Sequence, residues 1–101
     1  MNNAIYHKDG YIIVQNSSRG NRYYTVVNTN LYYKPHSHLK TFKQAKLVIH
    51  WCIKERIPNR YTNHMKGSIR RLRPDIDFDK LPEVDNNNEE IIEEVDVVEE
   101  D

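Results

Sequence analysis

The chain has 101 residues, a mean hydropathy of −0.86 and a formal net charge of zero. This length suits one small domain, and the single cysteine, Cys52, excludes intrachain disulfides and favours a reducing compartment. The sequence has no apolar run long enough for a signal peptide or a membrane span, so we expect a cytoplasmic protein without membrane contact.

The first elements are strand-like segments rich in β-branched and aromatic residues. The sequence predicts strands over residues 11–15 and 22–27, which the turn cluster at 16–21 would join into an antiparallel hairpin. A short third strand is expected over residues 31–34, and Pro35 would end it.

The two faces of this predicted sheet follow from the alternation of side chains along each strand. Facing the helix we expect Ile12, Val14, Tyr24 and Val26. The other face would then carry Tyr11, Ile13, Gln15, Tyr23, Thr25 and Val27. A slip of one residue would exchange the two sets.

A long helix is predicted over residues 41–57. Thr41 and Gln44 have the spacing of a capping box, and Pro58 disfavours helical geometry at Ile57. An apolar arc suited to a core contains Phe42, Ala45, Val48, Ile49, Cys52 and Ile53. A basic stripe on another side contains Lys43, Lys46, His50 and Lys54.

A second, shorter helix is predicted over residues 63–73, with Asn63 as its cap, Gly67 in its middle and Pro74 after its end. Its apolar side would dock by Met65, Ile69 and Leu72. Its basic side would expose Lys66, Arg70, Arg71 and Arg73. The fold class expected is α+β, a small three-stranded antiparallel sheet packed on one main helix, with this basic helix as an extension.

An acidic segment over residues 75–101 follows the basic module of residues 1–74. The link at 75–82 has Ile76, Phe78 and Leu81 as docking points, and the charge density beyond it favours disorder in the unbound tail. The tail residues expected to contact a protein partner are Ile91, Ile92, Val95, Val97 and Val98. The last three, with the acidic residues after them, resemble a SUMO-interacting motif.

Charge is divided almost completely between these two parts. Residues 1–74 contain 14 of the 15 Lys and Arg and two carboxylates, a net charge of +12. Residues 75–101 contain 13 carboxylates and one lysine, a net charge of −12. This split, with seven tyrosines and Trp51, is typical of contact with DNA or RNA, although a solvated surface balanced by a solubilising tail would also explain it.

Catalytic and metal-binding patterns are missing from the sequence. Only Asp9 and Glu55 supply carboxylates to the basic module, no nucleotide-binding glycine motif occurs, and no histidine spacing matches a zinc site. We therefore expect neither an enzyme nor a cofactor nor a bound metal, and the histidines are interpreted as exposed loop residues or, on the helix stripe, as an extra cation at low pH.

Two families of DNA-binding domain resemble the first half of the chain. The likeness covers about residues 9–57 and rests on Tyr11-Ile12-Ile13-Val14, on Arg22-Tyr23-Tyr24-Thr25-Val26, and on Thr41-Phe42 with Ala45. On these residues the chain is similar to ethylene-response-factor (Apetala-type) domains and to phage integrase arm-type domains. The resemblance implies that the sheet enters the major groove through Arg19, Arg22, Tyr23 or Tyr24, Thr25 and Lys34. The chain has Asn28-Thr29-Asn30 where those families usually carry a glycine.

The function expected is therefore a small nucleic-acid-binding accessory protein, with DNA as the expected ligand. Its acidic tail would compete with nucleic acid or recruit a partner. The alternative is a protein-binding inhibitor or adaptor of the phage type, whose tail imitates nucleic acid. The abundance of Asn, Tyr, Lys and Ile fits an AT-rich genome, such as that of a phage in a bacterial host.

Overall fold

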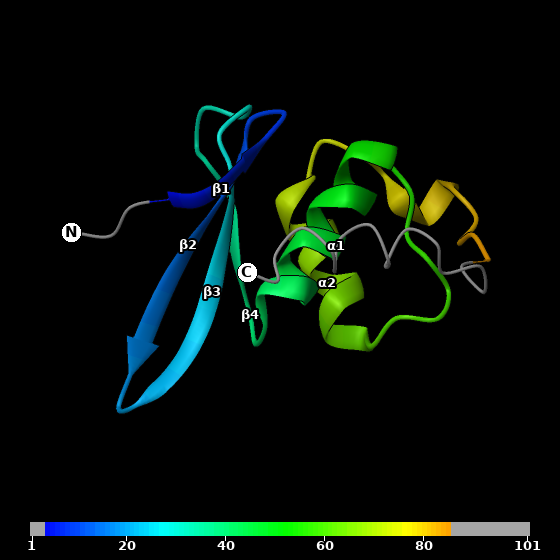
Figure 1. Cartoon of the computed structure of the whole chain (residues 1–101). Coiled ribbons are helices and arrows are strands. Elements are labelled where there is room, and N and C mark those ends of the chain that lie inside the picture. Colours follow the sequence, from blue (N-terminus) through cyan, green and yellow to red (C-terminus); the bar gives the residue numbers. More distant parts are fainter. Residues whose placement is uncertain (1–3, 86–101) are drawn as a thin grey trace.

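The computed structural model of the chain describes residues 4–85 (Figure 1). The elements in chain order are β1 (Ala4–Lys8), β2 (Tyr11–Ser18), β3 (Asn21–Asn28), β4 (His36–Leu39), α1 (Phe42–Lys54), α2 (Asn63–Leu72) and a 3-10 turn at Phe78–Lys80. The α+β class is confirmed. The expected partner-binding set of the tail lies outside the described residues.

The sheet has four strands rather than three, paired antiparallel in the order β1-β2-β3-β4. The third strand was predicted over 31–34, where the chain instead turns: the Lys34 amide donates to the Leu31 carbonyl at 2.9 Å, and Lys34 has φ 48°. The paired strand comes after Pro35 and alternates exposed His36 and His38 with buried side chains. Sequence analysis also missed β1, which is only five residues long.

The expected register of β2 is wrong by one residue. Ile13 lies opposite Val26, and both are completely buried, whereas Ile12 and Val14 are only half-buried. The prediction failed because both alternating sets of β2 are apolar, so the pattern does not distinguish its faces. For β3 the expectation is confirmed, since Val26 faces the helices.

Helix α1 begins as expected and ends earlier. The Thr41 hydroxyl accepts from the Gln44 amide at 3.0 Å, which satisfies one free donor of the first turn. The helix stops at Lys54 because Glu55 takes a left-handed conformation with φ 63°. The expected apolar arc is confirmed, with Phe42 and Ile53 partly buried and its other four members fully buried.

Helix α2 packs beside α1 on the same side of the sheet (Figure 1). Its cap is Thr62 rather than Asn63, and the Thr62 hydroxyl accepts from the Met65 amide at 3.2 Å. Ile69 and Leu72 are completely buried in the core between the two helices and the sheet. The far end of the β2–β3 hairpin extends past both helices.

The start of the acidic segment folds back onto the helices. The predicted docking points are confirmed: Phe78 is buried, and Ile76 and Leu81 are partly buried against the core. Val84 forms a parallel bridge with Pro58, its amide donating to the Ile57 carbonyl at 3.0 Å. Among residues 4–85, no helix is both long and apolar enough to cross a bilayer.

Candidate nucleic-acid interface

One face of the sheet is left open by the helices, which both pack against the other face (Figure 1). Antiparallel pairing aligns Val14, Thr25 and His38 in one row across this open face. A second row aligns Ile12, Val27 and His36. None of the four strands contains an Asp or a Glu. These four strands therefore present apolar, hydroxyl and imidazole groups on the open face and contribute no fixed negative charge to it.

Hydrogen bonds fix the polar side chains on this face. The Thr25 hydroxyl donates to the Asn16 side-chain oxygen at 2.7 Å and lies 3.0 Å from His38 Nδ1. The Tyr23 ring meets the His38 ring edge to face, with 5.2 Å between centroids. Tyr24 points to the opposite side, where it packs against Phe42. Of the two tyrosines left open by the resemblance, Tyr23 is the one on the open face.

The tip of the β2–β3 hairpin carries two of the expected contact residues. Arg19 is exposed in the turn with φ 54°, followed by Gly20 with φ 83°. Arg22 is also exposed, and alternation places it on the same face as Tyr24, away from Tyr23. Lys34 lies far from this tip, because it precedes β4, which begins opposite Val27 at the other end of β3.

The expected basic stripe on α1 is interrupted. Lys46 is only 3% exposed, and its ammonium lies 4.7 Å from the centre of the Phe42 ring and 5.5 Å from that of Tyr6. This cation therefore faces aromatic rings rather than solvent, and its expected place on an exposed basic stripe is wrong. Part of this environment comes from β1, a strand that was not predicted and that places Tyr6 near this side of the helix.

The other members of that stripe differ in exposure. Lys43 and Lys54 are exposed, whereas His50 is half-buried with its ring 5.2 Å from that of Trp51. The two lysines lie 11 positions apart on the helix, so they offer two separate charges rather than one continuous basic surface.

Three of the four expected cations of the second basic segment form ion pairs with the acidic segment. Lys66 meets Glu83 at 3.0 Å. Arg70 meets Asp79 at 3.1 Å. Arg73 meets Asp75 at 2.8 Å. Arg71 is exposed and lines a separate groove between α2 and β4.

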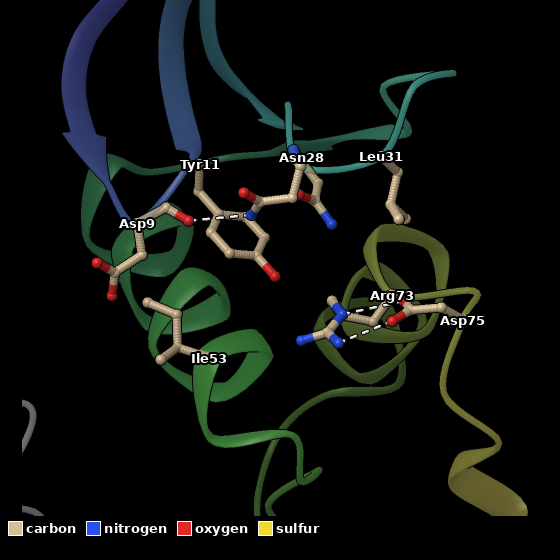
Figure 2. Close-up of a pocket in the computed structure, with 8 residues that line it drawn as sticks. Asp9, Tyr11, Asn28, Leu31, Ile53, Arg73 and Asp75 are labelled. Atoms are coloured by element: carbon tan, nitrogen blue, oxygen red, sulfur yellow. Dashed lines mark hydrogen bonds and ion pairs between the residues drawn. The ribbon is translucent and has the colours of Figure 1, made fainter.

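A hollow of about 270 Å³ lies where the ends of β2 and β3 meet the two helices (Figure 2). Its wall includes Asp9, Tyr11, Ile53, Arg73 and Asp75. Two carboxylates line it, and the arginine is already paired, so the hollow does not suit a polyanion. Burial raises the pKa of Tyr11 to about 12, and the nearby Cys52 adds to the rise.

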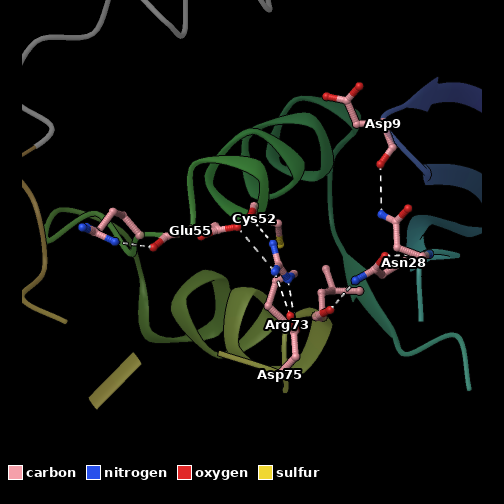
Figure 3. Close-up of polar contacts among 9 residues, drawn as sticks. Asp9, Asn28, Cys52, Glu55, Arg73 and Asp75 are labelled. Atoms are coloured by element: carbon pink, nitrogen blue, oxygen red, sulfur yellow. Dashed lines mark hydrogen bonds and ion pairs between the residues drawn. The ribbon is translucent and has the colours of Figure 1, made fainter. Parts of the chain in front are cut away.

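Arg73 connects three segments around this hollow (Figure 3). Its Nη1 donates to the Cys52 carbonyl at 2.9 Å, and Nη2 lies 3.6 Å from a Glu55 carboxylate oxygen. Two further bonds to Asp75 raise the pKa of the guanidinium and lower the pKa of the carboxyl. The contacts make Arg73 a structural cation.

Asn28 connects the sheet to α2 beside the same hollow (Figure 3). Its side chain is 1% exposed, donates to the Leu72 carbonyl at 2.8 Å and accepts from the Asn30 amide at 3.0 Å. The side-chain NH2 group of Asn28 therefore donates to one of the carbonyls in the last turn of α2, which lack a partner within the helix. The turn pattern at 28–30 gave no sign of this buried role.

The histidines contribute to this surface in a way that the sequence pattern did not predict. His36 and His38 were interpreted as exposed loop residues, and both are exposed, but β4 aligns them on the open face and α2 brings His64 beside them. The alternation in His36-Ser37-His38-Leu39 was the available signal of a strand. Within residues 4–85, no group of three or more His, Cys, Asp or Glu is arranged to hold a metal ion.

Comparison of the chain with protein-family models, with curated proteins and with solved structures gave no match.

Proposed function

We propose that the chain is a small nucleic-acid-binding protein, with DNA as the expected ligand, that binds through the open face of its sheet. The composition of that face carries the proposal: no strand contains a carboxylate, and Tyr23, Thr25 and His38 lie next to one another on it. A polyanion meets no like charge from these four strands, and a tyrosine ring accepts a stacked base or sugar.

The β2–β3 hairpin extends this surface. Its tip projects beyond the helices and carries exposed Arg19, while α1 and α2 support the sheet from behind (Figure 1). Phosphates along a strand or groove would meet Arg19 at the tip and bases would meet Tyr23 on the face. The similarity to ethylene-response-factor and integrase arm-type domains implies a comparable use of the sheet and remains a prediction.

The acidic segment is proposed to regulate this surface by competing with nucleic acid. Asp79 and Glu83 already neutralise two cations of α2 in the described part of the chain. We propose that the acidic residues beyond Asp85 act in the same way on exposed cations such as Arg19 and Arg71, or recruit a protein partner. Tethering gives such a segment an effective concentration of the order of millimolar, enough to compete with a weakly bound polyanion.

The decisive experiment compares the full chain with a chain truncated after Asp85. The truncated chain keeps every described residue, including buried Phe78, and has fifteen Lys and Arg against seven Asp and Glu. It should bind a labelled oligonucleotide more tightly than the full chain, and its affinity should fall steeply between about 50 and 200 mM salt. Fluorescence anisotropy measures both effects.

Absence of oligonucleotide binding by the truncated chain at low salt would reject the proposal. The alternative, a protein-binding inhibitor or adaptor whose acidic tail imitates nucleic acid, would then be favoured. In that case a synthetic peptide of residues 86–101 should compete with the full chain for a captured partner.

A matched pair of tyrosine variants locates the surface. Tyr23→Ala should weaken oligonucleotide binding by the value of one stacked base, about 1–3 kcal/mol. Tyr32→Ala is the control, because Tyr32 is 93% exposed and lies in the loop at the other end of β3. Equal effects of the two substitutions would show that the open face is not the binding surface.

A further inference from the structure

A groove between β4 and α2 gathers four side chains that are positive or can become so. It has a volume of about 280 Å³ and is lined by His36, Ser37, His38, His64 and Arg71. Within residues 4–85, no carboxylate lines it. Two of the histidines belong to the open face of the sheet, so the groove continues that face toward α2.

Direct hydrogen bonds hold the two walls of the groove together. The Ser37 and Ser68 hydroxyls lie 2.7 Å apart in a buried bond between β4 and α2. His64 Nε2 lies 2.8 Å from the His38 carbonyl, and because a carbonyl only accepts, Nε2 is the donor. The groove is therefore formed before any ligand arrives, which lowers the entropic cost of binding.

The hydrogen bonds also determine where His38 takes up a proton. The only hydroxyl hydrogen of Thr25 is donated to Asn16, so the Thr25 oxygen accepts a bond from Nδ1 of His38. In the neutral ring Nε2 then has a lone pair. Protonation at Nε2 converts this atom from an acceptor into a donor and adds a positive charge to the groove wall.

We propose that this groove binds a phosphate group, with Arg71 as the permanent charge and the histidines as charges that increase as the pH falls. Arginine presents several donors in a geometry that matches phosphate oxygens, and imidazolium N–H groups add further charge-assisted bonds. If the phosphate is part of a nucleic-acid backbone, the inference rests on the proposed function and assigns it a contact point. A free phosphate compound would use the same groups.

Proton uptake should accompany binding. The groups that face His38 are His36 on its own strand, Tyr23 and Thr25 on β3, and His64 and Arg71 on α2. Burial lowers the pKa of His38, and the charges of His36 and Arg71 lower it further. A bound phosphate counteracts that repulsion and raises the pKa of His38, so affinity for a phosphodiester, whose own charge stays constant near neutral pH, should increase as the pH falls.

The first experiment follows the histidine ring signals of the full chain by NMR during titration with inorganic phosphate at about pH 6. The rings of His36, His38 and His64 should shift together, and pH titrations with and without phosphate should show that phosphate raises the pKa of His38. Arg71→Gln should abolish these shifts. Arg70→Gln is the matched control, because it removes the same charge from the next position of α2, outside the groove.

The second experiment measures oligonucleotide affinity for the same proteins between about pH 6 and pH 8. If the ligand is a nucleic-acid phosphate, Arg71→Gln should reduce the salt slope by about 1, whereas Arg70→Gln should leave it unchanged. His38→Gln should flatten the dependence of affinity on pH.

The outcomes separate the two proposals. Ring shifts with inorganic phosphate, together with unchanged oligonucleotide binding by Arg71→Gln, would support the groove and assign it to a free phosphate compound. Oligonucleotide binding without any phosphate-induced ring shift would overturn the groove and leave the proposed function standing. Equal losses of phosphate binding in Arg70→Gln and Arg71→Gln would also overturn it, because general charge would then explain the effect.

Discussion

Arg73 and Asp75 form a two-point ion pair across Pro74, where the charge of the sequence changes sign. Nε of Arg73 lies 3.0 Å from one carboxylate oxygen and Nη2 lies 2.8 Å from the other. Since Nη1 also donates to the Cys52 carbonyl, the pair attaches the first residue of the acidic segment to the C-terminal end of α1. The change of charge therefore falls inside the folded unit, and a truncation at Pro74 would remove part of its packing.

Replacing this arginine should destabilise the fold. Arg73→Gln removes both bonds to Asp75 and leaves the partly buried Cys52 carbonyl without its charged donor. We expect a loss of about 1–3 kcal/mol in the free energy of unfolding, measured by urea denaturation. Arg70→Gln, which breaks an exposed pair with Asp79, should cost at most about 1 kcal/mol. Similar losses for the two variants would contradict a special role for Arg73.

The same substitution should have opposite effects at two glycines. Gly67 lies inside α2, and an added Cβ would meet no atom within 4 Å, so Gly67→Ala should stabilise the protein by about 1 kcal/mol. Gly10 has φ +85°, and a Cβ there would collide with the Asn30 side chain, so Gly10→Ala should destabilise it. Thermal unfolding of both variants tests the geometry, and a gain in stability at Gly10 would contradict it.

The register of β2 can be tested with two neighbouring isoleucines. Ile13→Ala should cost about 2–5 kcal/mol, because Ile13 is completely buried opposite Val26. Ile12→Ala should cost clearly less, since Ile12 is half-buried on the open face. Urea denaturation of the two variants decides the question. A larger loss at Ile12 would restore the register expected from the sequence pattern.

Alkaline conditions should destabilise the protein through two buried acids. Burial raises the pKa of Tyr11 from 10.0 to about 12 and that of Cys52 from 9.0 to about 12. The unfolded chain releases these protons at lower pH than the folded chain. The contribution of these two groups to the free energy of unfolding is therefore fully present below about pH 9 and declines toward about pH 12. Denaturation at a series of pH values measures the decline.

The contribution of Tyr11 to this decline can be separated by removing its hydroxyl. Tyr11→Phe should make the loss of stability between about pH 10 and pH 12 smaller. Tyr32→Phe should leave the profile unchanged, because Tyr32 is 93% exposed. An unchanged profile in Tyr11→Phe would show that this phenol does not cause the alkaline loss.

Local signals in the sequence were sufficient for the helices and the main hairpin. Thr41 caps α1 through the Gln44 amide, the apolar arc of that helix is buried, and β2 pairs with β3 where turn residues separate them. These features depend on contacts between residues close in the chain, or on a repeat of apolar residues that can be recognised without knowing what the element packs against. The division of charge at Pro74 could also be read directly.

Features that depend on distant partners could not be predicted. Both sets of alternating side chains in β2 are apolar, so only pairing with β3 and the position of α1 decide that Ile13 is inside. Lys46 has the same local pattern as exposed Lys43, yet it is buried, and its ammonium lies 5.5 Å from the centre of the Tyr6 ring of β1, which is distant in the chain. The pattern of side chains along one strand or helix indicates the type of that element, but it does not show which other segments pack against it.

In the candidate site, too, some features could be predicted from the sequence and others depend on contacts between distant segments. The sequence showed an excess of cations in the first 74 residues, and the resemblance to two DNA-binding families implied that Tyr23, Thr25 and Arg19 contact nucleic acid. Tertiary structure decided which cations are already paired, and it joined His36 and His38 of β4 to His64 and Arg71 of α2 in one groove. Such groupings arise because charges and hydrogen-bonding groups meet across space, at separations in the chain that no local period encodes.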